Sequence, residues 1–91
     1  MTRRLLIIED DPGLQSQMRW CFSEDLDVSV ASDRESALTC LRREEPEVVT
    51  LDLGLPPDPG GATEGFRLLE EILQLAPMTK VIVVTGREDK E

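Results

Sequence analysis

Acidic residues and one hydroxyl residue stand directly after short apolar runs of this chain. These residues are Glu9, Asp10, Asp11, Asp52 and Thr85. Carboxylates held close together repel one another unless a cation neutralises them. Mg²⁺ binds carboxylate oxygens and commonly completes its coordination with water and a phosphate. If folding brings these residues together, they predict a Mg²⁺-dependent phosphoryl site in which one carboxylate is the nucleophile and the hydroxyl donates to a phosphoryl oxygen.

The apolar runs have the length and composition of strands in a parallel sheet. Residues 4–8, 47–52 and 80–85 are rich in branched apolar residues, as is typical of strands buried on both faces. Residues 26–30 alternate apolar and polar, which predicts a half-buried strand at the edge of the sheet. Helical patterns separate the four strands, so we expect an α/β fold with helices on both faces and right-handed crossovers. All strands of such a sheet end at one edge, where ligands bind.

Three amphipathic helices are expected between these strands. Asp11 followed by Pro12 is typical of a helix start, and Ser32 with Glu35 predicts a capping box for the second helix. Trp20 falls outside the apolar stripe of the first helix, so we expect it to be partly exposed. The apolar stripes, which we expect to face the core, are Leu14, Met18, Cys21 and Phe22, then Ala37, Leu38 and Leu41, then Phe66, Leu69, Ile72 and Leu73.

Charge and composition exclude several classes of function. Nineteen acidic residues against ten basic ones give a net charge of −9, which argues against binding to nucleic acid or to an anionic membrane. The chain has no histidine, so neither histidine acid–base catalysis nor a phosphohistidine on this chain is expected. No apolar run has the length of a membrane span. Cys21 and Cys40 have no metal-ligand spacing, and in a chain without a signal-peptide pattern we expect them to be reduced core residues of a cytoplasmic protein.

Three segments together resemble the receiver domains of bacterial two-component response regulators. The segments are residues 5–11, 52–56 and 81–86, and their order and spacing match that family across nearly the whole chain. The resemblance implies a flavodoxin-like, doubly wound parallel sheet of strand order 2-1-3-4, with residues 1–91 forming one receiver domain. The stretch Gly-Gly-Ala-Thr-Glu-Gly at residues 60–65, after a Pro-rich loop, looks like an insertion into the family pattern. A loop of this kind is similar to regulators linked to PEP-CTERM exopolysaccharide systems, in which a receiver precedes an ATPase and a DNA-binding module.

The resemblance also implies a role for each residue of the site. Asp52 would accept a phosphoryl group from a sensor histidine kinase, and Thr85 would be the hydroxyl that switches toward it. Asp10 would bind Mg²⁺ directly, Glu9 would bind it through water, and the backbone carbonyl of Gly54 would be a further ligand. The metal-binding set implied is therefore Asp10, Asp52, Glu9 and Gly54. Asp11 stays open between a helix cap and an additional acid near the metal.

The chain departs from the family pattern after Thr85. The family continues with a helix, a fifth strand ending in a lysine, and a last helix, whereas Lys90 follows no apolar strand. We therefore expect a piece of a longer regulator whose transcriptional output domain lies outside this chain. Residues 81–84 would form an exposed edge that invites a homodimer.

Three functions follow from these observations. The first is a phospho-accepting switch, which is not an enzyme acting on an external substrate. The second is a pseudo-receiver that cannot be phosphorylated and serves as an interaction module. An aspartyl phosphatase is disfavoured, because Gly54 stands where such enzymes place a second acid.

Overall fold

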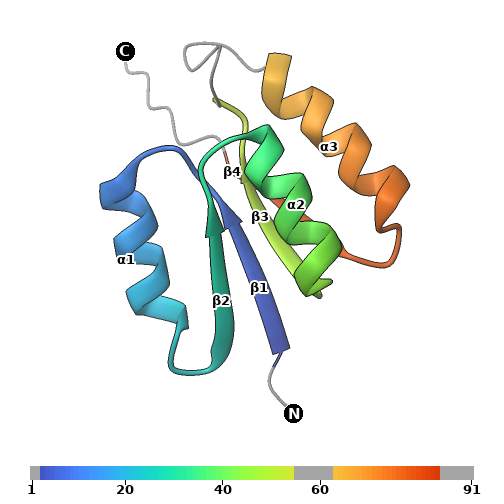
Figure 1. Cartoon of the computed structure of the whole chain (residues 1–91). Helices are drawn as coiled ribbons and strands as arrows, with labels where there is room; N and C mark the ends of the chain where they lie inside the picture. Colours follow the sequence, from blue (N-terminus) through green and yellow to red (C-terminus); the bar gives the residue numbers. More distant parts are fainter. Residues whose placement is uncertain (1–2, 55–62, 85–91) are drawn as a thin grey trace.

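The computed structural model describes residues 3–54 and 63–84 of the chain (Figure 1). Strands and helices alternate along this part of the sequence. None of its helices is long and apolar enough to cross a membrane. The elements are β1 (Arg3–Ile8), α1 (Pro12–Phe22), β2 (Leu26–Ala31), α2 (Arg34–Glu44), β3 (Val48–Asp52), α3 (Thr63–Leu75) and β4 (Lys80–Val84).

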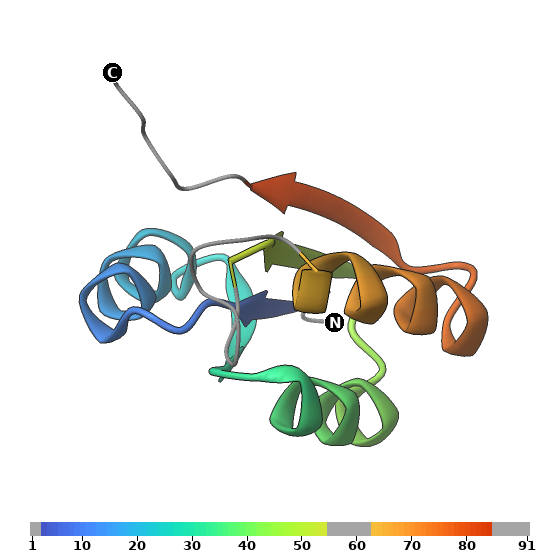
Figure 2. The same cartoon turned by 90° about the horizontal axis from the view of Figure 1, so that it is seen from above.

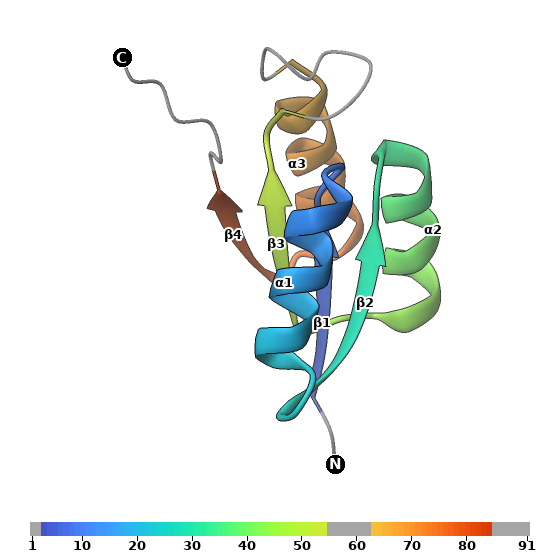
Figure 3. The same ribbon diagram turned by 90° about the vertical axis from the view of Figure 1, so that its left-hand side faces the viewer.

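The strands form one parallel sheet of order β2-β1-β3-β4, which confirms the predicted fold class and strand order. Strand β2 lies at one edge, as its alternating pattern indicates, and β4 lies at the other edge of the described sheet. Helix α1 lies on one face of the sheet, and α2 and α3 lie on the other (Figures 2 and 3). The continuous apolar strands β1 and β3 are therefore the two central strands of the described sheet, and β1 is covered by helices on both faces.

The main core lies between the sheet and the helices α2 and α3. It joins alternate residues of the central strands, such as Leu6 and Leu51, to the inner faces of the two helices, and Leu6, Leu51 and Leu68 are fully buried. Cys40 is buried there, which confirms its predicted place in the core. The remaining buried members are Ile8, Ala31, Ala37, Leu41, Val49 and Ile72.

Helix α1 is much more exposed than its apolar stripe predicts. No residue of α1 is buried, and Leu14 and Phe22 are 39% and 40% exposed. Cys21 is exposed too, so its predicted place in the core is wrong. The reason is that α1 packs only on β1 and β2 among the described elements, which leaves the rest of its apolar stripe without a neighbour there. Trp20 is 83% exposed, in line with its position off the stripe.

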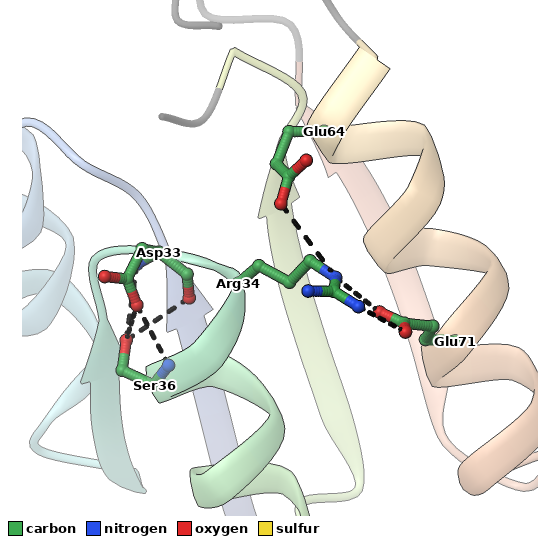
Figure 4. Close-up of polar contacts among 5 residues, drawn as sticks. All are labelled: Asp33, Arg34, Ser36, Glu64 and Glu71. Atoms are coloured by element: carbon green, nitrogen blue, oxygen red, sulfur yellow. Dashed lines mark hydrogen bonds and ion pairs between the residues drawn. The ribbon is translucent and has the colours of Figure 1, made fainter. Parts of the chain in front are cut away.

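The N-terminus of α2 is capped one residue later than predicted. Asp33 is the N-cap, and its carboxylate accepts a hydrogen bond from the Ser36 amide at 2.9 Å, while the Ser36 hydroxyl contacts the Asp33 carboxylate and backbone (Figure 4). These bonds lower the pKa of the Asp33 carboxyl. The prediction of Ser32 and Glu35 was wrong because both pairs have the same spacing, and the carboxylate of Asp33 is the stronger acceptor.

The buried stripe of α3 is rotated from the predicted one. Gly65, Leu68 and Ile72 are buried, whereas Phe66 is 54% and Leu73 is 50% exposed. The prediction was right for Ile72 and wrong for these two. Gly65 explains the rotation, because a Cβ at this position would lie 2.5 Å from the Leu53 Cα and would contact the Leu53 carbonyl oxygen even more closely. The helix approaches the end of β3 on the side that carries no side chain.

An ion-pair cluster joins α2 to α3 near the same edge of the sheet. The Arg34 guanidinium binds both carboxylate oxygens of Glu71, at 2.7 and 2.6 Å, and its Nε lies 3.9 Å from Glu64 (Figure 4). The hydrogen bonds from Arg34, together with its charge, lower the pKa of the Glu71 carboxyl. Two parallel hydrogen bonds fix geometry better than a single contact. Arg34, in the first turn of α2, thus binds acids in the first and third turns of α3.

Replacing Gly65 by alanine should destabilise the fold by about 1–3 kcal/mol, because the new methyl group meets backbone atoms that cannot move aside. Chemical denaturation of the variant measures this loss. Gly13→Ala in α1 is the matched control, since its Cβ would lie 3.3 Å from the flexible Asp11 side chain. That change should be neutral or stabilise the helix by up to about 1 kcal/mol. A Gly65→Ala variant as stable as the wild type would contradict the close approach of α3 to Leu53.

Candidate metal centre

Two neighbouring strands bring three of the predicted acids together. Glu9 and Asp10 directly follow β1, and Asp52 is the last residue of β3. The parallel register pairs Ile8 with Leu51, so the next residues after them, Glu9 and Asp52, are neighbours as well. One carboxylate oxygen from each of Glu9, Asp10 and Asp52 lies within 4.8 Å of the other two. This is the cluster that the pattern of strand ends predicts.

Glu9 is the buried member of the cluster, with 5% of its surface exposed. Its carboxylate accepts a hydrogen bond from the Asp11 amide at 3.2 Å. Burial, and then the nearby carboxyls of Asp52 and Asp10, raise the pKa of Glu9 from its ordinary value of 4.5 to about 7, against the lowering effect of that amide. The site is therefore one in which a third negative charge is costly.

Asp52 is half-buried at the rim of the sheet and open to a ligand. Its Oδ1 accepts a hydrogen bond from the Gly54 amide at 3.2 Å, which fixes the turn after β3. Gly54 thus lies beside Asp52, and the role of its carbonyl as a metal ligand stays a prediction. The turn is also held to the neighbouring strand, because the Leu53 amide donates to the Val84 carbonyl at 3.4 Å.

Asp11 is not part of the cluster. Its Oδ1 accepts hydrogen bonds from the amides of Gly13 at 2.9 Å and Leu14 at 3.4 Å, so it is the N-cap of α1. The structure thus shows the helix-cap role that the sequence left open, while the Asp11 amide still supports Glu9. Thr85 and Gly86 lie outside the described residues, so the switch hydroxyl stays a prediction.

Sequence reasoning missed Gln15, which reaches the site from α1. Its side-chain amide donates to the Glu9 carbonyl oxygen and, at 3.1 Å, to the Ser32 hydroxyl. The available signal was its position four residues after the Asp11 cap, on the side of the helix that faces the strand ends.

The chemistry of the cluster suits Mg²⁺. Three carboxylates at a rim supply hard oxygen ligands and leave positions for water and a phosphoryl group. Within residues 3–54 and 63–84, no arginine or lysine forms an ion pair with any of the three acids. The repulsion among them is thus left for a cation to relieve.

The family model of the response regulator receiver domain matches residues 5–91 of this chain. The chain belongs to the receiver family of two-component response regulators. Its acidic cluster and its sheet order are therefore those of a receiver, as the three sequence segments indicated.

Relatives of known name match the receiver over most of its length. A protein-glutamate methylesterase/protein-glutamine glutaminase of Rhizobium etli is 34% identical over 90% of this chain, and the match covers 23% of that protein. A probable C4-dicarboxylate response regulator, DctR, of Bacillus subtilis is 31% identical over 97% of this chain and is covered to 38%. The chain thus spans well under half the length of these relatives.

A solved structure has the same fold. The crystal structure of a CheY-like response regulator receiver domain protein from Methanospirillum hungatei superposes with a TM-score of 0.86 at 28% identity. The match covers 98% of this chain and 68% of that one.

Without divalent cations, the chain should become less stable as the pH rises from about 5 to about 7.5. The folded state keeps a proton on Glu9 up to a pKa of about 7, whereas the unfolded state releases it near 4.5, so the folded state binds more protons in this window. The loss is up to about 3 kcal/mol. The lowered pKa values of Asp33 and Glu71 change the stability only at pH values below this window, so they do not offset the loss of stability within it.

Denaturation in the presence of a chelator at several pH values measures the effect, and Glu9→Gln should flatten the profile. Added Mg²⁺ should restore stability mainly at the higher pH, because it binds the ionised carboxylates. An equal pH dependence in the wild type and in Glu9→Gln would assign it to other groups.

Proposed function

We propose that this receiver is a phospho-accepting signalling domain in which Asp52 takes up the phosphoryl group. The observation that carries the proposal is the position of Asp52, which is accessible at the strand edge and shares an acidic cluster with Glu9 and Asp10. A lone acid at a turn would need no such neighbours. The pseudo-receiver alternative lacks a reason for keeping three mutually repelling carboxylates together.

Each residue of the site would have a separate role in phosphoryl transfer. An oxygen of the Asp52 carboxylate attacks the phosphorus of a phosphohistidine on a sensor histidine kinase, so that a P–O bond forms as the P–N bond breaks. Asp10 and Asp52 would hold Mg²⁺ directly, with the Gly54 carbonyl as a further ligand and Glu9 acting through water. Bound Mg²⁺ supplies the positive charge that offsets the phosphoryl oxygens. Thr85 would donate to the transferred group.

We place the output function outside this chain. The chain corresponds to 23% of the methylesterase relative and 38% of DctR, which supports a receiver attached to a separate output domain in the parent protein. We propose a transcriptional output, a role for residues 1–91 as one receiver domain, and no enzymatic activity beyond its own phosphoryl transfer and dephosphorylation. The PEP-CTERM assignment depends on residues 60–65, of which the described part contains only 63–65, at the start of α3.

Incubation with acetyl phosphate and Mg²⁺ should add one phosphoryl group to the chain, measured by intact mass. Asp52→Asn should abolish the adduct, because an amide is not a nucleophile. Asp10→Asn should slow its formation at least about tenfold through weaker metal binding. Asp25→Asn is the matched control, since Asp25 is exposed before β2, at the opposite end of the sheet. Absence of the adduct in the wild type would favour the pseudo-receiver.

We also propose that the chain self-associates through the outer edge of β4. Among the described residues β4 pairs with β3 alone, and Ile82 and Val83 are 54% and 42% exposed. An apolar strand with an open edge invites pairing with another chain.

Sedimentation velocity should show a concentration-dependent dimer that Ile82→Lys weakens, because a charge blocks edge pairing. Phe66→Lys on α3 is the matched control, because Phe66 is also 54% exposed but lies away from the edge. A monomer at high concentration, or an equal effect of both variants, would contradict association through β4.

A further inference from the structure

Glu9 has a backbone carbonyl whose partner comes from a different element. The Glu9 amide donates to the Ala31 carbonyl of β2 at 3.0 Å, and the Glu9 carboxylate accepts from the Asp11 amide. The carbonyl oxygen accepts from the side-chain amide of Gln15, one turn into α1. The amide, the carboxylate and the carbonyl of Glu9 therefore each have a hydrogen-bond partner. Of the two hydrogen bonds to the Glu9 backbone named here, the one from Gln15 comes from a side chain.

Removal of the Gln15 amide would leave the Glu9 carbonyl without that donor. A buried carbonyl without a partner is costly, so the turn would shift to find water or another donor. Glu9 and Asp10 are consecutive residues of this turn, and both belong to the acidic cluster. A shift of the turn therefore moves two of the three carboxylates relative to Asp52, which is held separately at the end of β3.

Gln15 also connects the turn to the start of α2. The same amide donates to the Ser32 hydroxyl at 3.1 Å, and the Ser32 amide contacts the Ser36 hydroxyl at 3.3 Å within the α2 cap. Ser32 and Ser36 are exposed, so these links are weaker than the bond to Glu9. The bond to Glu9 is the one that bears on the cluster.

We propose that Gln15 is a positioning residue of the metal centre, which holds the Glu9–Asp10 turn in the geometry that Mg²⁺ requires. The proposal rests on the Mg²⁺ site proposed above. Mg²⁺ demands near-ideal octahedral geometry, whereas Ca²⁺ accepts variable coordination. Loss of positioning thus weakens Mg²⁺ binding more than Ca²⁺ binding, whereas a loss of folded protein weakens both by the same factor.

The test is calorimetric titration of the 91-residue chain with Mg²⁺ and, separately, with Ca²⁺. Gln15→Met keeps side-chain length and helix propensity but removes the amide. It should weaken Mg²⁺ binding about tenfold, at the lower end of the effect of residues that orient metal ligands, and Ca²⁺ binding less. Gln17→Met is the matched control, because Gln17 is exposed on the same helix, and it should change neither affinity. Ser32→Ala keeps the bond to Glu9 and should stay close to the wild type.

The outcomes separate the two proposals. A wild-type chain that binds neither cation contradicts the metal site itself. A wild type that binds Mg²⁺, with Gln15→Met binding it equally well or losing Mg²⁺ and Ca²⁺ affinity in the same proportion, overturns the role of Gln15 alone. The ratio of the two affinities does not depend on the folded fraction, so the test holds even where Gln15→Met is partly unfolded.

Discussion

The repulsion among three carboxylates at the end of β1 and β3 is the constraint on which the rest of this receiver depends. Parallel pairing of the two strands places Glu9 beside Asp52, and burial leaves Glu9 with little water to screen its charge. Burial, and then the neighbouring carboxyls, raise the pKa of Glu9 to about 7, so ionisation of Glu9 beside the other two acids is costly. A bound cation offsets the repulsion among the carboxylates, and protonation of Glu9 reduces it as well. The arrangement that could hold a metal ion therefore also makes the stability of the fold sensitive to pH when no cation is bound.

A set of side-chain and backbone contacts at the same edge holds the acids in place. All three helices begin near the carboxyl ends of the strands, so their first turns lie at the level of the cluster (Figure 3). The Asp11 side chain caps α1, and its amide donates a hydrogen bond to the Glu9 carboxylate. Because Gly65 has no side chain, α3 packs directly against Leu53, the residue after Asp52. Arg34 then ties α3 to α2. The cluster is supported from each helix and not by its own interactions, which are repulsive.

The sequence predicted what depends on local pattern and failed where the neighbours decide. Continuous apolar runs identified β1 and β3 as central strands, and parallel strands must end together, so the grouping of Glu9, Asp10 and Asp52 followed. The stripe of α1 was recognised, but a stripe does not say how much of it is covered. For α3, two stripes fit a helical period, and only the contact of Gly65 with Leu53 selects between them. The spacing of Gln15 from Asp11 indicates a helix face, but it does not show the tertiary contact with Glu9 that gives Gln15 its role.

The open side of the sheet lies close to Asp52, the proposed phospho-acceptor. Helices α2 and α3 close one face, whereas α1 contacts only β1 and β2, so the α1 side of β3 and β4 is uncovered among the described elements. Val84 of β4 pairs with Asp52, and the Leu53 amide reaches the Val84 carbonyl. A segment that pairs with the outer edge of β4 is therefore separated from β3, the strand that ends at Asp52, by β4 alone. If phosphorylation changes the affinity for such a segment, linkage requires that the segment change the phosphorylation equilibrium by the same factor. The register pair of Asp52 with Val84 and the hydrogen bond from Leu53 to Val84 are the direct contacts between the end of β3 and β4 that such linkage would involve.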